Sequence, residues 1–115
     1  MAMTVSERAS GAVTIVDLDG GVTADGGAHH IRDKVRSLLQ QGRKNILVNL
    51  AAVPYMDSVG LGELVQAYAT TTHQGGKLKL LNATKRLRDL LVITKLATVF
   101  DIFDDESKAV ASFDH

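Results

Sequence analysis

The sequence has 115 residues, of which 45% are hydrophobic and 23% charged, a composition typical of a soluble globular protein. We expect a single domain over residues 1–115, because this length supports one hydrophobic core and not two. The 13 basic and 13 acidic residues cancel, so no overall field recruits nucleic acid or an anionic membrane. The absence of cysteine excludes disulfides and thiol catalysis.

The chain carries no signal for a membrane or for export. No segment approaches the roughly 20 apolar residues of a membrane-spanning helix, and the N-terminus lacks the apolar core of a secretion signal. A chain without cysteine also fits a reducing compartment. We therefore expect a cytoplasmic protein that does not insert into a membrane.

Apolar residues recur along the chain with the periods of strands and helices in alternation. The clearest strand signal is the continuous apolar run 45–50, the kind that a parallel sheet buries on both faces. Gly42 and Gly75-Gly76 are typical helix stops. The expected elements are strands at 3–6, 13–18, 45–50, 77–81 and 98–103, helices at 24–41, 58–73 and 85–93, and a short helix from 104 that buries Val110 and Phe113.

This order of elements, joined by short connections, predicts the fold class. Strand and helix alternate from residue 13 onward, which favours parallel strands joined by helical crossovers. Residues 3–6 fit an edge strand that returns through the Ser10-Gly11 turn. We expect an α/β domain with a mixed, mostly parallel sheet of four to five strands and about four helices.

The run Met-Asp-Ser-Val-Gly-Leu-Gly at residues 56–62 is the most informative segment of the chain. A hydroxyl at a turn from strand to helix, such as that of Ser58, can cap the helix, act as a nucleophile or accept a phosphate. Serine is a preferred N-cap, worth about 1 kcal/mol, so capping is its commonest role. Gly60 and Gly62 each cost a helix roughly 1 kcal/mol relative to alanine. We interpret these glycines as room for close approach of a partner, although close packing against the sheet explains them equally well.

Two enzymatic or signalling alternatives fit this turn poorly. A hydrolase nucleophile elbow requires glycine two residues before Ser58, where Met56 stands, and no acid-then-histidine order follows for a triad. A receiver domain phosphorylated at Asp57 would need a close acidic pair after its first strand, whereas Asp17 and Asp19 alternate within the strand. We therefore expect no enzyme activity, no catalytic residues and no cofactor.

We expect no metal site either. His29 and His30 are adjacent, so on a helix their side chains point about 100° apart and do not easily share one ion. The acidic residues at 101 and 104–106 lack the loop glycine of a calcium site and fit the start of a helix.

From Asn49 onward the chain resembles the STAS domain family, and within it the small stand-alone bacterial anti-sigma factor antagonists. The resemblance rests on the apolar strand 45–50, on the run from Tyr55 to Gly62, and on the Gly-Gly-Lys-Leu sequence at 75–78. It covers about residues 12–113 and implies the α/β fold described above. Val59 stands where the family usually has serine or threonine.

The resemblance implies a partner switch. In this family the serine directly after the aspartate is phosphorylated by an anti-sigma factor, itself a serine kinase of the histidine-kinase-like ATPase fold. The unphosphorylated form binds that factor and frees the sigma factor, and a PP2C-type phosphatase resets it. Ser58 falls on this serine.

The partner-binding surface is expected at the Ser58 turn and on the outward positions of the helix that follows. An added phosphate would spoil this contact through repulsion and desolvation. The expected partner-binding residues are Asp57, Ser58, Val59, Gly60, Gly62, Glu63 and Gln66, while Leu61, Leu64, Val65 and Tyr68 form the opposite, buried stripe.

A second hypothesis keeps the fold without the switch. In it the chain is a constitutive STAS subunit of a stress-signalling scaffold or of an ABC (lipid) transporter, and Ser58 is only a helix cap.

Overall fold

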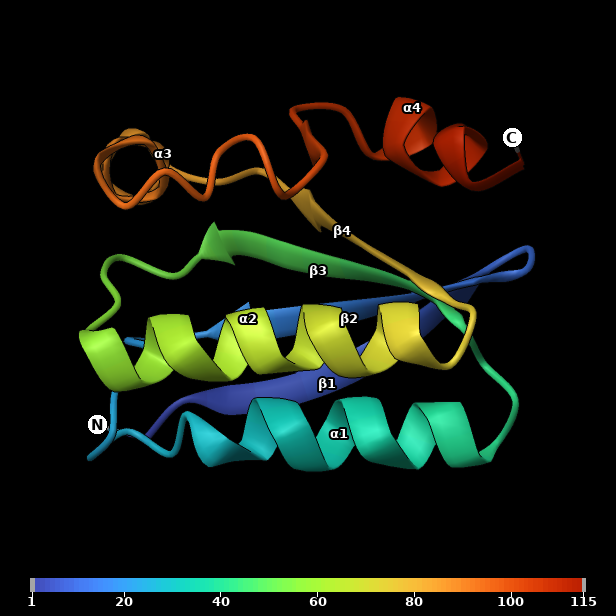
Figure 1. The fold of residues 1–115 in the computed structure, drawn as a ribbon, viewed down its shortest axis with the longest axis horizontal. Helices are drawn as coiled ribbons and strands as arrows, with labels where there is room; N and C mark the ends of the chain where they lie inside the picture. Colours follow the sequence, from blue (N-terminus) through green and yellow to red (C-terminus); the bar gives the residue numbers. More distant parts are fainter. Residues whose placement is uncertain (1, 115) are drawn as a thin grey trace.

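The computed structural model describes residues 2–114 and shows a twisted sheet with helices on both sides (Figure 1). The five strands lie side by side in the order β1-β2-β3-β4-β5. β1 is antiparallel to β2, and all other neighbours are parallel. The strands are β1 (Thr4–Ser10), β2 (Val13–Asp19), β3 (Asn45–Ala52), β4 (Lys77–Leu81) and β5 (Ile102–Phe103). The helices are α1 (His29–Gln40), α2 (Ser58–His73), α3 (Lys85–Ile93) and α4 (Glu106–Ala111), followed by a 3-10 turn at Ser112–Asp114.

These elements confirm the predicted α/β fold and its mixed, mostly parallel sheet. α2, β4 and α3 begin and end where the sequence pattern places them. The predicted edge strand at residues 3–6 is the longer β1, which returns into β2 through a turn at Gly11 with φ of +59°.

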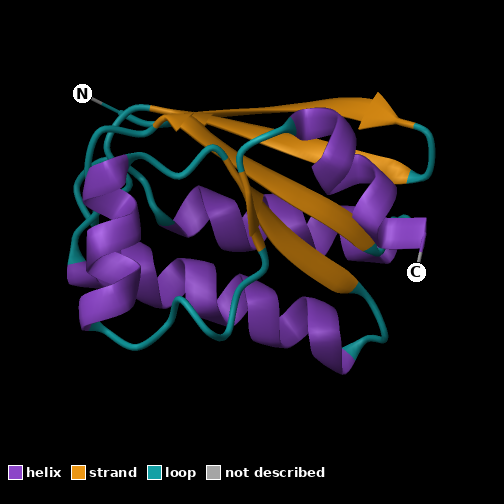
Figure 2. Ribbon diagram, turned by 90° about the horizontal axis from the view of Figure 1, so that it is seen from above, coloured by secondary structure: helices purple, strands orange, loops and turns teal. Residues whose placement is uncertain are grey.

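β3 is the centre of the fold and is buried on both faces, as its continuous apolar run predicts. α1 and α2 lie side by side along one face of the sheet (Figures 1 and 2). Val48 packs there with Val35 of α1 and Leu64 of α2, and all three are buried. Leu47 points to the opposite face and packs against Phe113 at the C-terminal end. Alternate side chains of β3 therefore hold two separate cores together.

α1 begins five residues later than the predicted helix 24–41. Gly27 has φ of +94°, which a continuing helix does not allow. The Thr23 hydroxyl accepts a hydrogen bond from the Gly26 N–H at 2.9 Å, which closes a turn instead. The backbone N–H of Ala24 is bonded to a residue of another segment, Asp57. Residues 23–28 therefore form an irregular segment next to the start of α2.

The predicted strand 98–103 is largely wrong, because only Ile102 and Phe103 pair with β4. The chain before them turns instead, with the N–H groups of Val99 and Phe100 both donating to the carbonyl of Leu96. Phe100 is buried and makes an edge-to-face contact with Tyr68 of α2, the ring centroids lying 5.1 Å apart. This aromatic contact needs a turned backbone, so the strand is short.

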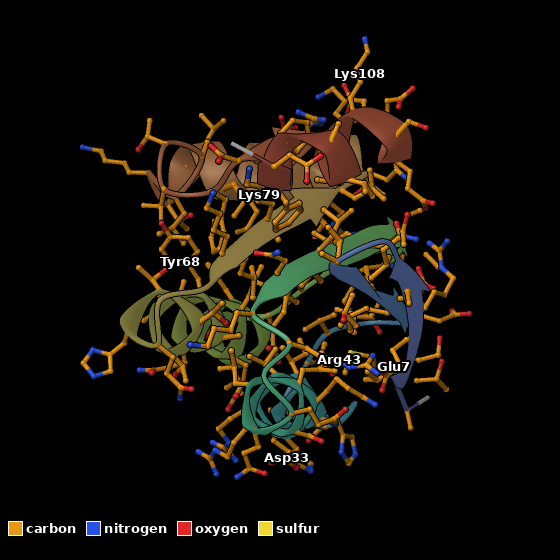
Figure 3. The ribbon with its side chains drawn as sticks, turned by 90° about the vertical axis from the view of Figure 1, so that its right-hand side faces the viewer. Glu7, Asp33, Arg43, Tyr68, Lys79 and Lys108 are labelled. Carbon is orange, nitrogen blue, oxygen red and sulfur yellow. The ribbon has the colours of Figure 1, made fainter. Side chains whose placement is uncertain are left out.

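The C-terminal helix α4 is held on the second face of the sheet by a buried lysine. Lys79 Nζ donates hydrogen bonds to the Ser112 carbonyl at 3.1 Å and to the Ser112 hydroxyl at 2.9 Å. The same ammonium lies 4.7 Å from the ring centroid of Phe113, close enough for a cation–π interaction. Figure 3 shows Lys79 beneath α4 and Lys108 pointing away from the molecule. In the described part of the chain, no helix has the length and apolar character to span a membrane.

Candidate functional site

The start of α2 is capped by Asp57 and not by Ser58, which corrects the capping role expected for the serine. The Asp57 backbone is extended, and its Oδ1 accepts a hydrogen bond from the Gly60 N–H at 2.8 Å. Ser58 is the first residue within the helix. An acidic side chain directly before the first helical residue accepts from a backbone N–H of the first turn, which has no partner within the helix. The serine hydroxyl is thereby left without a capping role.

Asp57 also joins two segments that are distant in sequence. Its Oδ2 accepts a hydrogen bond from the Ala24 N–H at 3.0 Å. The neighbouring backbone completes the junction, since Val22 N–H donates to the Tyr55 carbonyl at 3.1 Å and Asp57 N–H donates to the Val22 carbonyl at 3.2 Å. The hydrogen bonds from Gly60 and then from Ala24 hold the pKa of the Asp57 carboxyl below its usual range.

Gly60 is explained by close packing inside the domain and not by room for a partner. Gly60 is buried, and a Cβ placed on it would lie 1.9 Å from the carbonyl oxygen of Val22. The expectation that Gly60 leaves space for a partner is therefore wrong. Gly62 differs, because it is exposed and a Cβ there would meet no atom within 4 Å.

The residues around Ser58 present an open surface. Ser58 is exposed, and its hydroxyl makes no hydrogen bond within residues 2–114. Val59, the next residue, is 48% exposed although it is apolar. Gly62 and Gln66 follow on the exposed side of α2. Ser58, Val59, Gly62 and Gln66 are thus all accessible at the start of α2. Their role in binding a partner stays a prediction.

Glu63 does not point outward as the helical spacing suggests. Its side chain is only 16% exposed, and its Oε1 lies 3.3 Å from Nη1 of Arg32 on α1. The other carboxylate oxygen is buried without a hydrogen-bond partner among the described residues. Glu63 therefore lies at the contact between α1 and α2, and it joins two helices instead of facing a partner.

The four residues predicted to form the buried stripe of α2 all pack against the core, but they are buried to different extents. Leu64 is fully buried, while Leu61, Val65 and Tyr68 are partly buried against the same core. This face positions the helix on the sheet, so the Ser58 end projects past the C-terminal end of β3 (Figure 1).

An apolar surface contributed by α3 was missed in the sequence. Val92 is 63% exposed and Ile93 78% exposed, both off the buried stripe of Leu87 and Leu91. A groove of about 280 Å³ separates α3 from the segment that leads to Ser58, and its lining residues are Met56, Arg86, Leu87, Asp89, Leu90 and Ile93. The adjacent apolar pair at the end of the helix was the signal that could have revealed this surface.

Relatives of the chain share a regulatory name. The anti-sigma-B factor antagonist of Bacillus subtilis (strain 168) is 42% identical over 72 residues, which cover 63% of this chain and 65% of that protein, just under two thirds of it. The anti-sigma F factor antagonist of Paenibacillus polymyxa is 26% identical over 107 residues, covering 89% of this chain and 87% of that protein.

Solved structures show the same fold. An anti-sigma factor antagonist from Mycobacterium paratuberculosis superposes with a TM-score of 0.85 at 16% identity, covering 99% of this chain and 96% of that one. The Bacillus cell fate determinant SpoIIAA in its phosphorylated form superposes with a TM-score of 0.72 at 20% identity, covering 96% and 98%. A model of the STAS domain family matches residues 4–109. The chain belongs to the STAS domain family.

Proposed function

We propose that this protein is an anti-sigma factor antagonist that binds its anti-sigma factor through the Ser58 turn and is released when Ser58 is phosphorylated. The names of the relatives at 42% and 26% identity support the antagonist role. The kinase activity of the anti-sigma factor and the PP2C-type phosphatase that reverses the modification are part of the same proposal, drawn from the family resemblance.

The observation that carries the proposal is that the Ser58 hydroxyl is exposed and engaged with nothing in the described chain. Because Asp57 already caps the helix, Ser58 can be modified without the loss of a structural hydrogen bond. A kinase can therefore reach the hydroxyl in the folded domain.

The modification changes the charge of the turn strongly. Transfer of the γ-phosphoryl group from ATP forms an O–P bond at Ser58 Oγ, releases ADP and displaces the hydroxyl proton. Hydrolysis of that bond by water returns the serine and inorganic phosphate. With Asp57 ionised beside it, the local charge goes from −1 to about −3. A partner that packs apolar or acidic groups against this turn would be repelled.

The exposed apolar residues beside the turn suit such a partner. Val59 is 48% exposed and Tyr55 45%, and both are close in sequence to Met56. Ile93, which is 78% exposed, lines the same groove as Met56. Burial of these side chains would favour binding, while a phosphate at the same place would have to be desolvated. The exposed apolar side chains would therefore favour binding of the partner, and a phosphate on Ser58 would oppose it.

The test is a phosphorylation assay with the kinase-type anti-sigma factor of the same organism and ATP. Intact-mass measurement should show the addition of one phosphate to the wild type and none to Ser58→Ala. Ser107→Ala, which removes another exposed serine, should be modified like the wild type. No modification of the wild type, together with stable binding, would favour the constitutive-subunit hypothesis.

A further inference from the structure

We propose that His29, His30 and Asp33, at the start of α1, bind one divalent transition-metal ion of the zinc type. One ligand atom from each of the three side chains lies within 4.8 Å of the ligand atoms of the other two. All three residues are exposed, so an ion can reach them from solvent. The proposal does not depend on the function of Ser58.

The geometry of the helix explains why these three residues meet. Adjacent histidines point about 100° apart, which by itself argues against a shared ion. Asp33 is four residues after His29 and three after His30, so it projects about 40° from the first and about 60° from the second. The carboxylate therefore lies between the two imidazoles, one turn further along. Asp33 thus supplies a third ligand beside the two histidines, contrary to the expectation of no metal site.

The local packing keeps the two imidazoles together. Their ring centroids are 4.2 Å apart, with the planes tilted by 41°. His30 also lies against Gly27, where a Cβ would come within 2.8 Å of the imidazole Cδ2. Because Gly27 has φ of +94°, a side chain is disfavoured there on two grounds. The absence of a side chain at Gly27 therefore leaves room for the His30 ring beside His29.

The ligand atoms are also available for coordination. Within residues 2–114, the side chains of Asp33, His29 and His30 make no hydrogen bond or ion pair, and the two imidazoles lie against each other. The two cations adjacent to Asp33 in sequence pair with other carboxylates, Lys34 with Glu7 at 3.0 Å and Arg32 with Glu63 at 3.3 Å. Figure 3 shows Asp33 on the side of α1 that faces away from the sheet.

The set of donors indicates the kind of metal. Two imidazole nitrogens and one carboxylate oxygen suit zinc and its first-row neighbours, whereas Mg²⁺ and Ca²⁺ prefer oxygen ligands alone. Three ligands from one helical turn leave the remaining coordination positions to water or to a fourth ligand from another molecule.

The experiment is calorimetric titration of the untagged, metal-free full chain with Zn²⁺ near neutral pH, with Mg²⁺ as the comparison ion. We expect one Zn²⁺ per chain, no measurable Mg²⁺ binding, and a rise in the melting temperature with Zn²⁺ because the ion binds the folded state. His29→Ala and His30→Ala should each weaken binding at least tenfold, and Asp33→Asn should weaken it several-fold.

His73→Ala is the matched control, since His73 is an exposed histidine at the opposite end of another helix, α2, and it should bind Zn²⁺ like the wild type. Circular dichroism will show whether each variant is folded. If His30→Ala is not folded, the Zn²⁺ affinity of the His29→Ala variant tests the proposal instead. No Zn²⁺ binding by the wild type, equal loss of binding in His73→Ala, or undiminished binding in the folded His29→Ala variant would overturn the proposal.

Discussion

The carboxylate of Asp57 accepts a hydrogen bond from the backbone N–H of Ala24 at 3.0 Å, across 33 positions of sequence. Its other oxygen caps α2 through the Gly60 N–H at 2.8 Å. One side chain therefore fixes both the start of the helix and the irregular segment that precedes α1. The adjacent Ser58 side chain makes neither of these hydrogen bonds.

Asp57→Ala should destabilise the domain, whereas Ser58→Ala should not. Loss of an N-cap lowers the folding equilibrium constant roughly fivefold, and the bond to Ala24 is lost as well. Ser58→Ala removes an exposed hydroxyl with no partner in the described chain, so its free energy of unfolding should stay within about 0.5 kcal/mol of the wild type. Urea unfolding measures both. A larger loss in Ser58→Ala than in Asp57→Ala would show that the serine is the cap.

The stability that Asp57 provides should depend on pH. Its pKa in the folded protein is lowered by the hydrogen bonds from Gly60 and Ala24, so the ionised form stabilises the fold at pH values above the unfolded pKa of about 3.9. This contribution is lost as the pH falls through the folded pKa. Urea unfolding from neutral to acidic pH should therefore show a smaller acid loss for Asp57→Asn than for the wild type. If the free energy of unfolding depended on pH in the same way in both proteins, the stabilising role of the ionised Asp57 would be contradicted.

Alanine at the two glycines of the first turns of α2 should have opposite effects. A Cβ at residue 60 would overlap the Val22 carbonyl, so Gly60→Ala should cost about 1–3 kcal/mol through overpacking. Gly62→Ala has free space around it and should stabilise the helix by about 0.5–1 kcal/mol. Thermal and urea unfolding provide the comparison. A stable Gly60→Ala variant would mean that the loop at Val22 yields easily.

Lys79→Met should loosen the attachment of α4. Methionine keeps much of the apolar stem but cannot donate to the two Ser112 oxygens, so we expect a loss of about 1–3 kcal/mol. Lys108→Met is the control, because Lys108 is exposed on α4 itself, and it should change the free energy of unfolding by less than about 0.5 kcal/mol. Amide hydrogen exchange should rise across α4 in the first variant only. Unchanged amide exchange across α4 in Lys79→Met would show that the bonds from Lys79 to Ser112 do not hold this helix in place.

Most of the helices and strands could be predicted because their apolar spacing and their end residues are visible in the local sequence. α2 and α3 have apolar residues at helical spacing and are followed by helix stops, and β3 is a mostly apolar strand. The short β5 and the late start of α1 could not be predicted in this way. Phe100 turns inward to meet Tyr68, and Gly27 adopts a positive φ in a segment bonded to Asp57. Both depend on contacts between residues far apart in sequence.

The sequence predicted where α2 begins but not the structural role of each residue at its start. Asp57 and Ser58 were both expected at the turn, but local propensity does not separate two adjacent residues that are both good caps. Gly60 and Glu63 were expected to face a partner, but in the folded chain they contact Val22 and Arg32. These contacts could not be foreseen, because the two residues lie 38 and 31 positions away in sequence. Such contacts become visible only when the strands and helices are placed together.

In the proposed switch, a negative charge at Ser58 releases the anti-sigma factor. The most direct measurement is the dissociation constant of that factor from wild type, Ser58→Ala and Ser58→Asp, by calorimetry with the purified full-length proteins. The proposal predicts that Ser58→Ala binds like the unphosphorylated wild type and that Ser58→Asp binds at least tenfold more weakly. Equal affinities for all three would contradict it, because the charge at Ser58 would then not control the interaction.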